Sequence, residues 1–312
     1  MFLTSCATPV EKPRPSKRSS REVPARFERH QISHDGRERY YDLYEPSRKG
    51  ARQKLPMVIV LHGAGQTPDE IVQLTRFNKL AERERFVVVY PAGTGHTPER
   101  LFWNVLLSQT YATSEKVDDP GFLDAVVTQV MDKVSIDRKR IYVAGFSQGG
   151  MLGYRLMCDA GWSKRLAGVA VVGATMTVAP EDCTPARNVP LLSIHGLQDP
   201  FNNFAGGIGS KASRNDRVAR PGVYETIDYW ADRGGFTAEP DTSESRGQAA
   251  CRHFVATTNS FEIISWEIMS GGHTWPGSPA NLPAWMVGDV NFDIDATSLI
   301  WNFFQRHSIH SR

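Results

Sequence analysis

Ser147 has the surroundings of a catalytic nucleophile. It is the third residue of G-F-S-Q-G at 145–149, between the apolar residues 142–144 and a segment with helical spacing. A serine at a sharp strand-to-helix turn exposes its hydroxyl group, and Gly145 and Gly149 permit the close packing that such a turn requires. The pattern predicts a nucleophile elbow for acyl transfer. Because similar turns also arise by chance, the interpretation depends on finding partner residues.

An acyl-transfer serine needs a histidine base and an acid that orients this base. In the open-sheet hydrolases these residues follow the serine in the order acid, then histidine. Asp199 comes just after a short apolar strand predicted at 191–195, and His273 lies in the glycine-rich segment 270–277. We therefore predict Asp199 as the acid and His273 as the base.

His253 is the one rival to His273 as the base. The other histidines after the serine are excluded by chain order or by a polar C-terminal setting: His195, His307 and His310. Asp199 has competitors of which none directly follows an apolar strand: Asp216, Asp228, Asp232 and Asp241.

Backbone N–H groups are expected to stabilise the oxyanion of such a reaction. One is the N–H of Gln148, which follows the nucleophile. The second is assigned to Ala64, in the turn H-G-A-G that follows the buried strand predicted at 57–61. His62 stands at this strand-to-loop junction, where a histidine more often hydrogen-bonds the loop and holds its shape than acts in catalysis.

The ordered motifs resemble a known family. LHGAGQ, FWN, DDPGFLDAVV, GFSQGGM, IHGLQDP, GGHTWPG and DATSLIWNFF occur in this order between residues 35 and 306. Together they are similar to the polyhydroxybutyrate depolymerase and feruloyl esterase family of secreted α/β-hydrolases. GGHTWPG and the closing DATSLIWNFF are the most specific parts.

The resemblance implies an extracellular carboxylic ester hydrolase for polymer-bound or hydroxycinnamoyl esters. By position, Ser147 resembles the nucleophile, Asp199 the acid and His273 the base, while Ala64 and Gln148 resemble the oxyanion hole. Many members have cysteine in place of Ala64 and asparagine or alanine in place of Gln148. Only the backbone N–H groups serve the chemistry, so these departures change the shape of the pocket rather than the reaction.

Composition agrees with an enzyme of this class. The 312 residues, with a formal net charge of +2, suit one α/β domain at 27–312. Scattered basic residues argue against nucleic acid as a partner, and no apolar run reaches the length of a membrane span. Nucleotide fingerprints and metal-spaced Cys/His clusters are also absent from the sequence, so side chains must perform the chemistry without a cofactor or metal.

The apolar patterns predict a doubly wound, mainly parallel sheet of the α/β-hydrolase fold, preceded by a β-hairpin at 26–34 and 38–44. Further strands are predicted at 57–61, 86–90, 141–144, 168–172, 191–195 and 262–268. Helices are predicted at 70–83, 121–134, 149–159, 223–232 and 296–305. The polar, glycine-rich segments 201–222 and 236–260 are predicted to be loops or excursions near the site.

Three residues could line the substrate pocket. Trp103 and Asn104 follow a strand-end loop, where ligand sites of α/β sheets gather, and Trp275 flanks the predicted base. The alternative is that these tryptophans only fill the core. Asp118 and Asp119 are predicted to cap the helix that begins near Gly121.

Residues 1–26 depart from the globular composition and are predicted to form a disordered, basic, proline-rich tail. Within them, L-T-S-C ending at Cys6 resembles a bacterial lipobox, although only five residues precede the cysteine. Either the true start lies upstream and Cys6 carries a lipid anchor, or the match is chance. A polar tether after the cysteine favours the first alternative, and with it an extracytoplasmic location.

The remaining cysteines are Cys158, Cys183 and Cys251. A bridge between Cys158 and Cys183 is plausible in an oxidising compartment, and buried free thiols are the alternative.

The leading function is a serine esterase. A peptidase, a lipase or a polymer-binding module without catalysis are the alternatives, and the sequence names neither the acyl nor the alcohol group.

Overall fold

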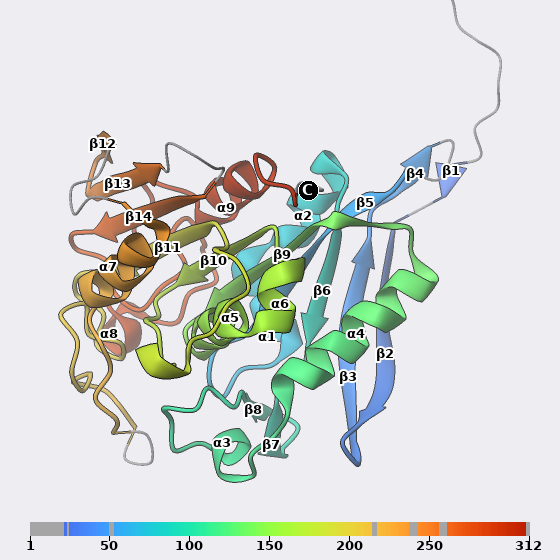
Figure 1. The fold of residues 1–312 in the computed structure, drawn as a ribbon, viewed down its shortest axis with the longest axis horizontal. Coiled ribbons are helices and arrows are strands. Elements are labelled where there is room, and N and C mark those ends of the chain that lie inside the picture. The colour runs from blue at the N-terminus through green and yellow to red at the C-terminus, as the bar shows by residue number, and fades with distance from the viewer. Residues whose placement is uncertain are drawn as a thin grey trace, which may run out of the picture.

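A computed structural model describes residues 22–23, 25–49, 53–213, 217–236, 242–255 and 261–309. A ten-stranded sheet runs through the molecule (Figure 1). Its strands are β2 (Arg26–His34), β3 (Arg37–Glu45), β5 (Leu55–Leu61), β6 (Val87–Pro91), β9 (Ile136–Phe146), β10 (Gly168–Val172), β11 (Leu191–Gly196), β12 (Thr242–Arg246), β13 (Ala249–Val255) and β14 (Glu262–Ile268). They lie in the order β12-β13-β14-β11-β10-β9-β5-β6-β3-β2.

The six strands from β14 to β6 are parallel to their neighbours. Their carboxyl ends therefore share one edge of the sheet, which we call the carboxyl edge. Antiparallel strands flank this core on both sides, β3 and β2 beyond β6, and β13 and β12 beyond β14. The predicted mainly parallel sheet and its N-terminal hairpin are confirmed.

Helices cover both faces of the sheet because its central strands are apolar on both sides. Along β5, Met57 and Ile59 belong to one core cluster, whereas Val58 and Val60 belong to the other. The helices are α1 (Pro68–Thr75), α2 (Phe77–Glu84), α3 (Tyr111–Ser114), α4 (Asp119–Lys133), α5 (Gln148–Cys158), α6 (Ala160–Arg165), α7 (Val223–Gly234), α8 (Ala284–Val287) and α9 (Ala296–Phe304). Buried residues of α4, α5 and α7 pack in the first cluster, and those of α1, α2 and α9 pack in the second.

The helix predicted at 70–83 is two helices. Thr67 caps α1 through a capping box with Glu70, and the chain then turns at Arg76, which has a left-handed φ of 55°. The Arg76 side chain donates a hydrogen bond to the Gly277 carbonyl oxygen at 2.8 Å. Arginine is an ordinary helix former, so the sequence carries no signal for this break.

The segment predicted as a loop at 236–260 contains β12 and β13. This pair extends the sheet as an antiparallel hairpin beside β14. The prediction was wrong because β12 reads T-S-E-S-R and is an exposed edge strand. Charged and polar residues are common on such edges and hide the alternation that identifies inner strands.

Part of the predicted N-terminal tail has structure. Glu22–Val23 forms β1, which pairs antiparallel with β4 (Arg48–Lys49) in a separate two-stranded sheet. A second small sheet pairs β7 (Thr94–Thr97) with β8 (Arg100–Phe102) beyond the carboxyl edge. Among the described residues, no helix is both long enough and apolar enough to cross a membrane.

Cys158 and Cys183 form a disulfide that joins the end of α5 to the loop before β11. Backbone hydrogen bonding reinforces this connection, since the Thr184 N–H donates to the Cys158 carbonyl oxygen at 3.1 Å. Cys251 is a free, buried thiol on β13. The sequence left open a disulfide or free thiols at Cys158 and Cys183, and the structure contains the disulfide.

We expect loss of this bridge to weaken the fold. The two cysteines are 25 residues apart, and closing a loop of this size restricts the unfolded chain by about 3 kcal/mol. The double variant Cys158→Ser/Cys183→Ser should lose about this free energy of unfolding in urea titrations. A reducing agent should destabilise the wild type and the control Cys251→Ala alike, but not the double variant. Equal sensitivity of the double variant to reduction would contradict the assignment.

Candidate active site

Ser147 stands at the turn from β9 into α5. Its φ of 53° and ψ of −122° are rare for a residue with a side chain and store strain at this one position. The turn is possible because two glycines allow close contact. A Cβ on Gly145 would lie 2.3 Å from the Gly149 carbonyl oxygen, and one on Gly149 would lie 2.3 Å from the carbonyl oxygen of Leu61.

Asp199 and His273 form a buried hydrogen-bonded pair. His273 Nδ1 lies 2.6 Å from Asp199 Oδ2, and because a carboxylate accepts, Nδ1 carries the proton and Nε2 is left to accept one. The second carboxylate oxygen, Oδ1, accepts the backbone N–H groups of Phe201 and Asn202, each at 2.8 Å. Burial acts to raise the pKa of Asp199, but the charge and hydrogen bond of His273 outweigh it and hold this pKa below its ordinary value.

His195 is a second histidine next to the Asp199 carboxylate. Its Nε2 donates to the Asn202 carbonyl oxygen at 2.8 Å and lies 3.5 Å from Asp199 Oδ2. Burial lowers the pKa of His195, which favours the neutral ring. Asn202 in turn donates from Nδ2 to the Gly173 carbonyl oxygen at 2.6 Å. The sequence prediction missed both supporting residues, although I-H-G-L-Q-D-P-F-N-N places them within four residues of Asp199.

Tight packing joins the serine turn to the carboxylate–histidine pair. Phe146 is the residue before Ser147, and its ring centroid lies 4.9 Å from the ring centroid of His273. Gly173, at the end of β10, faces the pair, since a Cβ there would lie 3.2 Å from His273 Nδ1 and 3.6 Å from Asp199 Oδ2. The structure thus gathers the three predicted catalytic residues at the carboxyl edge, after β9, β11 and β14.

The loop with Ala64 passes over the serine. A Cβ on Gly63 would lie 3.3 Å from the Ser147 Cβ, and Ala64 is exposed next to it. Gln148 is the first residue of α5, so its N–H has no acceptor within the helix. Both predicted oxyanion donors therefore border Ser147, one on the chain just after it and one on the facing loop.

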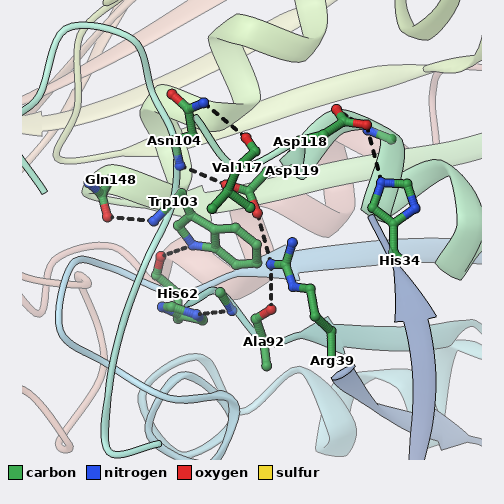
Figure 2. A network of polar contacts seen from close by, with 12 residues as sticks. His34, Arg39, His62, Ala92, Trp103, Asn104, Val117, Asp118, Asp119 and Gln148 are labelled. Carbon is green, nitrogen blue, oxygen red and sulfur yellow. Dashed lines mark hydrogen bonds and ion pairs between the residues drawn. The ribbon is translucent and has the colours of Figure 1, made fainter. Parts of the chain in front are cut away.

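His62 holds this loop, as predicted (Figure 2). Gly93 donates its N–H to His62 Nε2 at 3.0 Å, so Nδ1 carries the ring proton and donates to the Gly63 carbonyl oxygen at 2.8 Å. Complete burial lowers the pKa of His62 to about 4, so the ring is neutral near neutral pH. A neutral histidine in this tautomer serves as a fixed connector rather than as a base.

The three predicted substrate residues are buried and their polar side-chain atoms have partners within the protein, while their contact with substrate stays a prediction. Trp103 is fully buried and donates its Nε1–H to the His62 carbonyl oxygen at 2.9 Å (Figure 2). Asn104 donates from Nδ2 to the Val117 carbonyl oxygen, and Trp275 from Nε1 to Thr297 Oγ1 at 3.0 Å. They pack behind the site because their polar atoms find partners in the protein.

The side chain of Gln148 has a part that sequence reasoning missed. Its Oε1 accepts the N–H of Trp103 at 2.9 Å, and its Nε2 donates to Thr110 Oγ1 at 3.3 Å. The amide thus ties the start of α5 to the segment 103–110. Its place after the nucleophile was the available signal, but the sequence could not show what the amide would reach.

Asp118 and Asp119 have different roles. Asp118 caps α4 as predicted, accepting the Gly121 N–H at 3.0 Å. Asp119 is instead fully buried and paired with Arg39 of β3, with 2.8 Å between Asp119 Oδ1 and Arg39 Nη2 (Figure 2). The prediction that Asp119 is a second cap was wrong, since a partner 80 positions earlier in the chain is invisible to local pattern.

The rival histidine His253 lies elsewhere. On β13 its Nε2 is 2.5 Å from Glu262, which also binds Arg306 and His307. His307, from the segment that the sequence analysis describes as polar, is buried there. Of the competing acids, Asp228 and Asp232 are exposed on α7, and the others lie outside the described residues, as does His310. Within the described ranges, no group of three or more Cys, His, Asp or Glu could hold a metal ion.

Comparison with known proteins shows which esterases the chain resembles. Residues 39–177 match the family model described as esterase PHB depolymerase. The putative esterase NocK of Nocardia uniformis subsp. tsuyamanensis is 28% identical over 256 residues, which cover 78% of this chain and 72% of NocK. Feruloyl esterase B of Piromyces equi is 26% identical over 225 residues, 70% of this chain and 39% of that protein.

A bifunctional acetylxylan esterase/xylanase of Neocallimastix patriciarum is 28% identical over 198 residues, covering 61% of this chain and 26% of that protein. The chain thus spans less than half the length of each of these last two relatives. Among solved structures, the acetyl xylan esterase from Aspergillus awamori superposes with a TM-score of 0.56 at 16% identity, covering 79% of this chain and 94% of the other, which supports the fold. Over residues 39–177 the chain is thus similar to the esterase PHB depolymerase family, and over 225 residues to a feruloyl esterase; it is a carboxylic ester hydrolase of the α/β-hydrolase fold.

Proposed function

We propose that the protein is a serine esterase that works through an acyl-enzyme, with Ser147, His273 and Asp199 as its catalytic triad. The observation that carries the proposal is the buried 2.6 Å hydrogen bond between His273 Nδ1 and Asp199 Oδ2, beside the strained Ser147 turn. This bond holds the tautomer in which Nε2 can accept the serine proton.

In the proposed reaction, Nε2 of His273 takes the proton of the Ser147 hydroxyl group while Oγ attacks the ester carbonyl carbon. The N–H groups of Ala64 and Gln148 stabilise the resulting oxyanion. The C–O bond to the alcohol then breaks, and His273 gives its proton to the leaving oxygen. Water repeats these steps on the acyl-enzyme and releases the carboxylic acid and Ser147. Asp199 stabilises the imidazolium in both halves.

We further propose a polymer-bound, hydroxycinnamoyl or hydroxyalkanoate ester as the substrate. The names of two relatives support this class, since one is a feruloyl esterase and the other an acetylxylan esterase. Large exposed apolar side chains in loops and in α8 support the same class: Leu106, Leu107, Leu197, Ile208, Leu282 and Trp285.

A substrate panel tests the function. We expect the wild type to hydrolyse p-nitrophenyl acetate and at least one of methyl ferulate, acetylated xylan and hydroxybutyrate oligomers. Ser147→Ala should reduce turnover by a factor on the order of 10⁶ while circular dichroism and thermal unfolding stay unchanged. A fluorophosphonate probe should label the wild type only. Residual turnover within about tenfold of the wild type would sink the assignment.

The base and the acid are tested by paired substitutions. His273→Ala should cost as much as Ser147→Ala because triad members act as a unit, and Asp199→Asn should lower kcat by a factor on the order of 10⁴ through the wrong tautomer. His253→Ala is the matched control, since this histidine also pairs with a carboxylate but stands on β13. A silent His273→Ala together with a damaging His253→Ala would reverse the assignment.

We also propose that the protein works outside the cytoplasm, with 27–312 as one catalytic domain and the preceding residues as a tether. The Cys158–Cys183 bridge supports this location because disulfides persist in oxidising compartments. The lipid anchor proposed at Cys6 lies outside the described residues.

Fractionation of producing cells checks the location. A lipid-anchored protein should partition with membranes and incorporate labelled palmitate, and Cys6→Ser should release it into a soluble extracytoplasmic fraction. Recovery in the cytoplasm with both Cys158 and Cys183 open to alkylation would contradict the proposal. Recovery outside the cytoplasm but without label would retain the location and remove the anchor.

A further inference from the structure

An unbroken line of hydrogen bonds leads from the buried Arg39 to Ala64. Arg39 Nη2 donates to the Ala92 carbonyl oxygen at 2.8 Å, and the N–H of the same peptide group, on Gly93, donates to His62 Nε2 at 3.0 Å (Figure 2). His62 Nδ1 donates to the Gly63 carbonyl oxygen at 2.8 Å, and the N–H of that peptide group belongs to Ala64.

Two peptide planes make this line mechanically stiff. A peptide group is planar, and in its trans form the C=O and N–H bonds point in opposite directions. Holding the Gly63 carbonyl oxygen therefore also sets the direction of the Ala64 N–H. In the same way, holding the Ala92 carbonyl oxygen sets the direction of the Gly93 N–H, which decides the tautomer of His62.

The positive charge of Arg39 also polarises this line of hydrogen bonds, starting from the end at the Ala92 carbonyl oxygen. Each hydrogen bond in such a series strengthens the next donor, and burial enhances this effect. Arg39 is almost completely buried, with its guanidinium carbon 3.6 Å from the centre of the Phe122 ring. A positive charge fixed against the Ala92 carbonyl oxygen pulls electron density toward itself and so makes every N–H further along the line a better donor.

Asp119 keeps this charge in place. It pairs with Arg39 at 2.8 Å, and its other oxygen accepts the Asn104 N–H at 2.6 Å. The adjoining Trp103 binds the His62 carbonyl oxygen and the Gln148 side chain. The ion pair thus holds, from one buried point, segments that reach both proposed oxyanion donors.

We propose that Arg39 is a positioning residue for ester hydrolysis, which orients and polarises the Ala64 N–H through the Ala92–Gly93 peptide and His62. The proposal rests on the proposed function, since it assigns Arg39 to the oxyanion hole of that site. It requires an effect on the transition state, where the oxyanion forms, and little effect on binding of the ester.

The first test compares two arginines of the N-terminal hairpin. Arg39→Met should lower kcat by about tenfold, less than the loss of a whole oxyanion donor, and leave KM within about twofold. A trifluoromethyl ketone, which forms a tetrahedral adduct with the serine, should lose affinity by the same factor. Arg39→Lys should recover part of kcat because it keeps a charged donor.

Arg29→Met is the matched control. Arg29 also binds a buried aspartate, with 2.7 Å and 2.9 Å to the two oxygens of Asp42. Its other contacts in the described part of the chain are with Asp69 of α1, at 3.4 Å, and with the Tyr40 ring, and not with the groups that form the line from Arg39 to Ala64. Its kcat should stay within about twofold of the wild type at matched stability. Equal losses in Arg29→Met and Arg39→Met would reduce Arg39 to a structural ion pair and overturn the proposal.

The second test is a double-mutant cycle with His62→Asn. The asparagine amide can still donate to the Gly63 carbonyl oxygen but is too short to accept the Gly93 N–H, so it cuts the line between Arg39 and Ala64. In this background, Arg39→Met should have no further effect on kcat beyond about twofold. A loss of the same size in both backgrounds would show that Arg39 acts without His62 and overturn the proposal.

The cycle is repeated with Arg39→Lys, which keeps a positive charge beside Asp119 and so preserves the fold if Arg39→Met does not. Its smaller loss of kcat should likewise vanish in the His62→Asn background. Failure of the proposed function can be distinguished from failure of the positioning role. A wild type that turns over no ester and binds no trifluoromethyl ketone overturns the proposed function. An active wild type with an unchanged kcat in both Arg39 variants overturns the positioning role alone.

Discussion

The contact of Gly149 with the end of β5 determines where the proposed active site of this protein can lie. A Cβ at Gly149 would lie only 2.3 Å from the Leu61 carbonyl oxygen, so α5 starts directly against the strand that leads into the Ala64 loop. Because of this close approach, the serine turn and the loop that carries Ala64 lie next to each other at the end of β5. The strained φ of Ser147 is sustained by the packing around it, because a single unfavourable dihedral costs only about 1–3 kcal/mol.

Asp199 and Glu262 are buried carboxylates that hydrogen-bond histidines, and their surroundings separate their roles. Asp199 holds His273 at the carboxyl edge, beside the serine turn. Glu262 holds His253, His307 and Arg306 at the start of β14, which is the end of this strand away from the carboxyl edge. Its hydrogen bonds to these three partners offset burial and hold the pKa of Glu262 well below its ordinary value. We regard this second group as a clamp that joins β13 and the C-terminal residues to the sheet.

The Arg39–Asp119 pair is costly for a fold to keep. Burying two charges requires desolvation that their attraction does not always recover, and removal of one partner typically costs about 3–5 kcal/mol. An apolar pair of similar size could fill the space. The charges instead hold the Ala92 carbonyl oxygen and the Asn104 N–H, on the two segments that support the His62 loop and α5. Their retention is consistent with a use that apolar side chains could not serve.

By itself, the sequence determined the elements whose pattern is local. The apolar runs of β5, β10, β11 and β14 predict inner strands, and the order of Ser147, Asp199 and His273 along the chain places each just after one of these strands or β9. Parallel strands end at a common edge, so the approximate location of all three residues followed from pattern alone. Their roles in catalysis stay predictions.

Only the tertiary structure decided which polar groups meet across long stretches of chain. The edge strand β12 carries no alternation, the break at Arg76 depends on Gly277, and Asp119 finds Arg39 instead of a helix end. Trp103 and Trp275 are likewise placed in the core by hydrogen-bond partners distant in sequence. Periodicity reports which face of an element is buried, whereas the partner of a buried polar atom depends on how the whole chain packs.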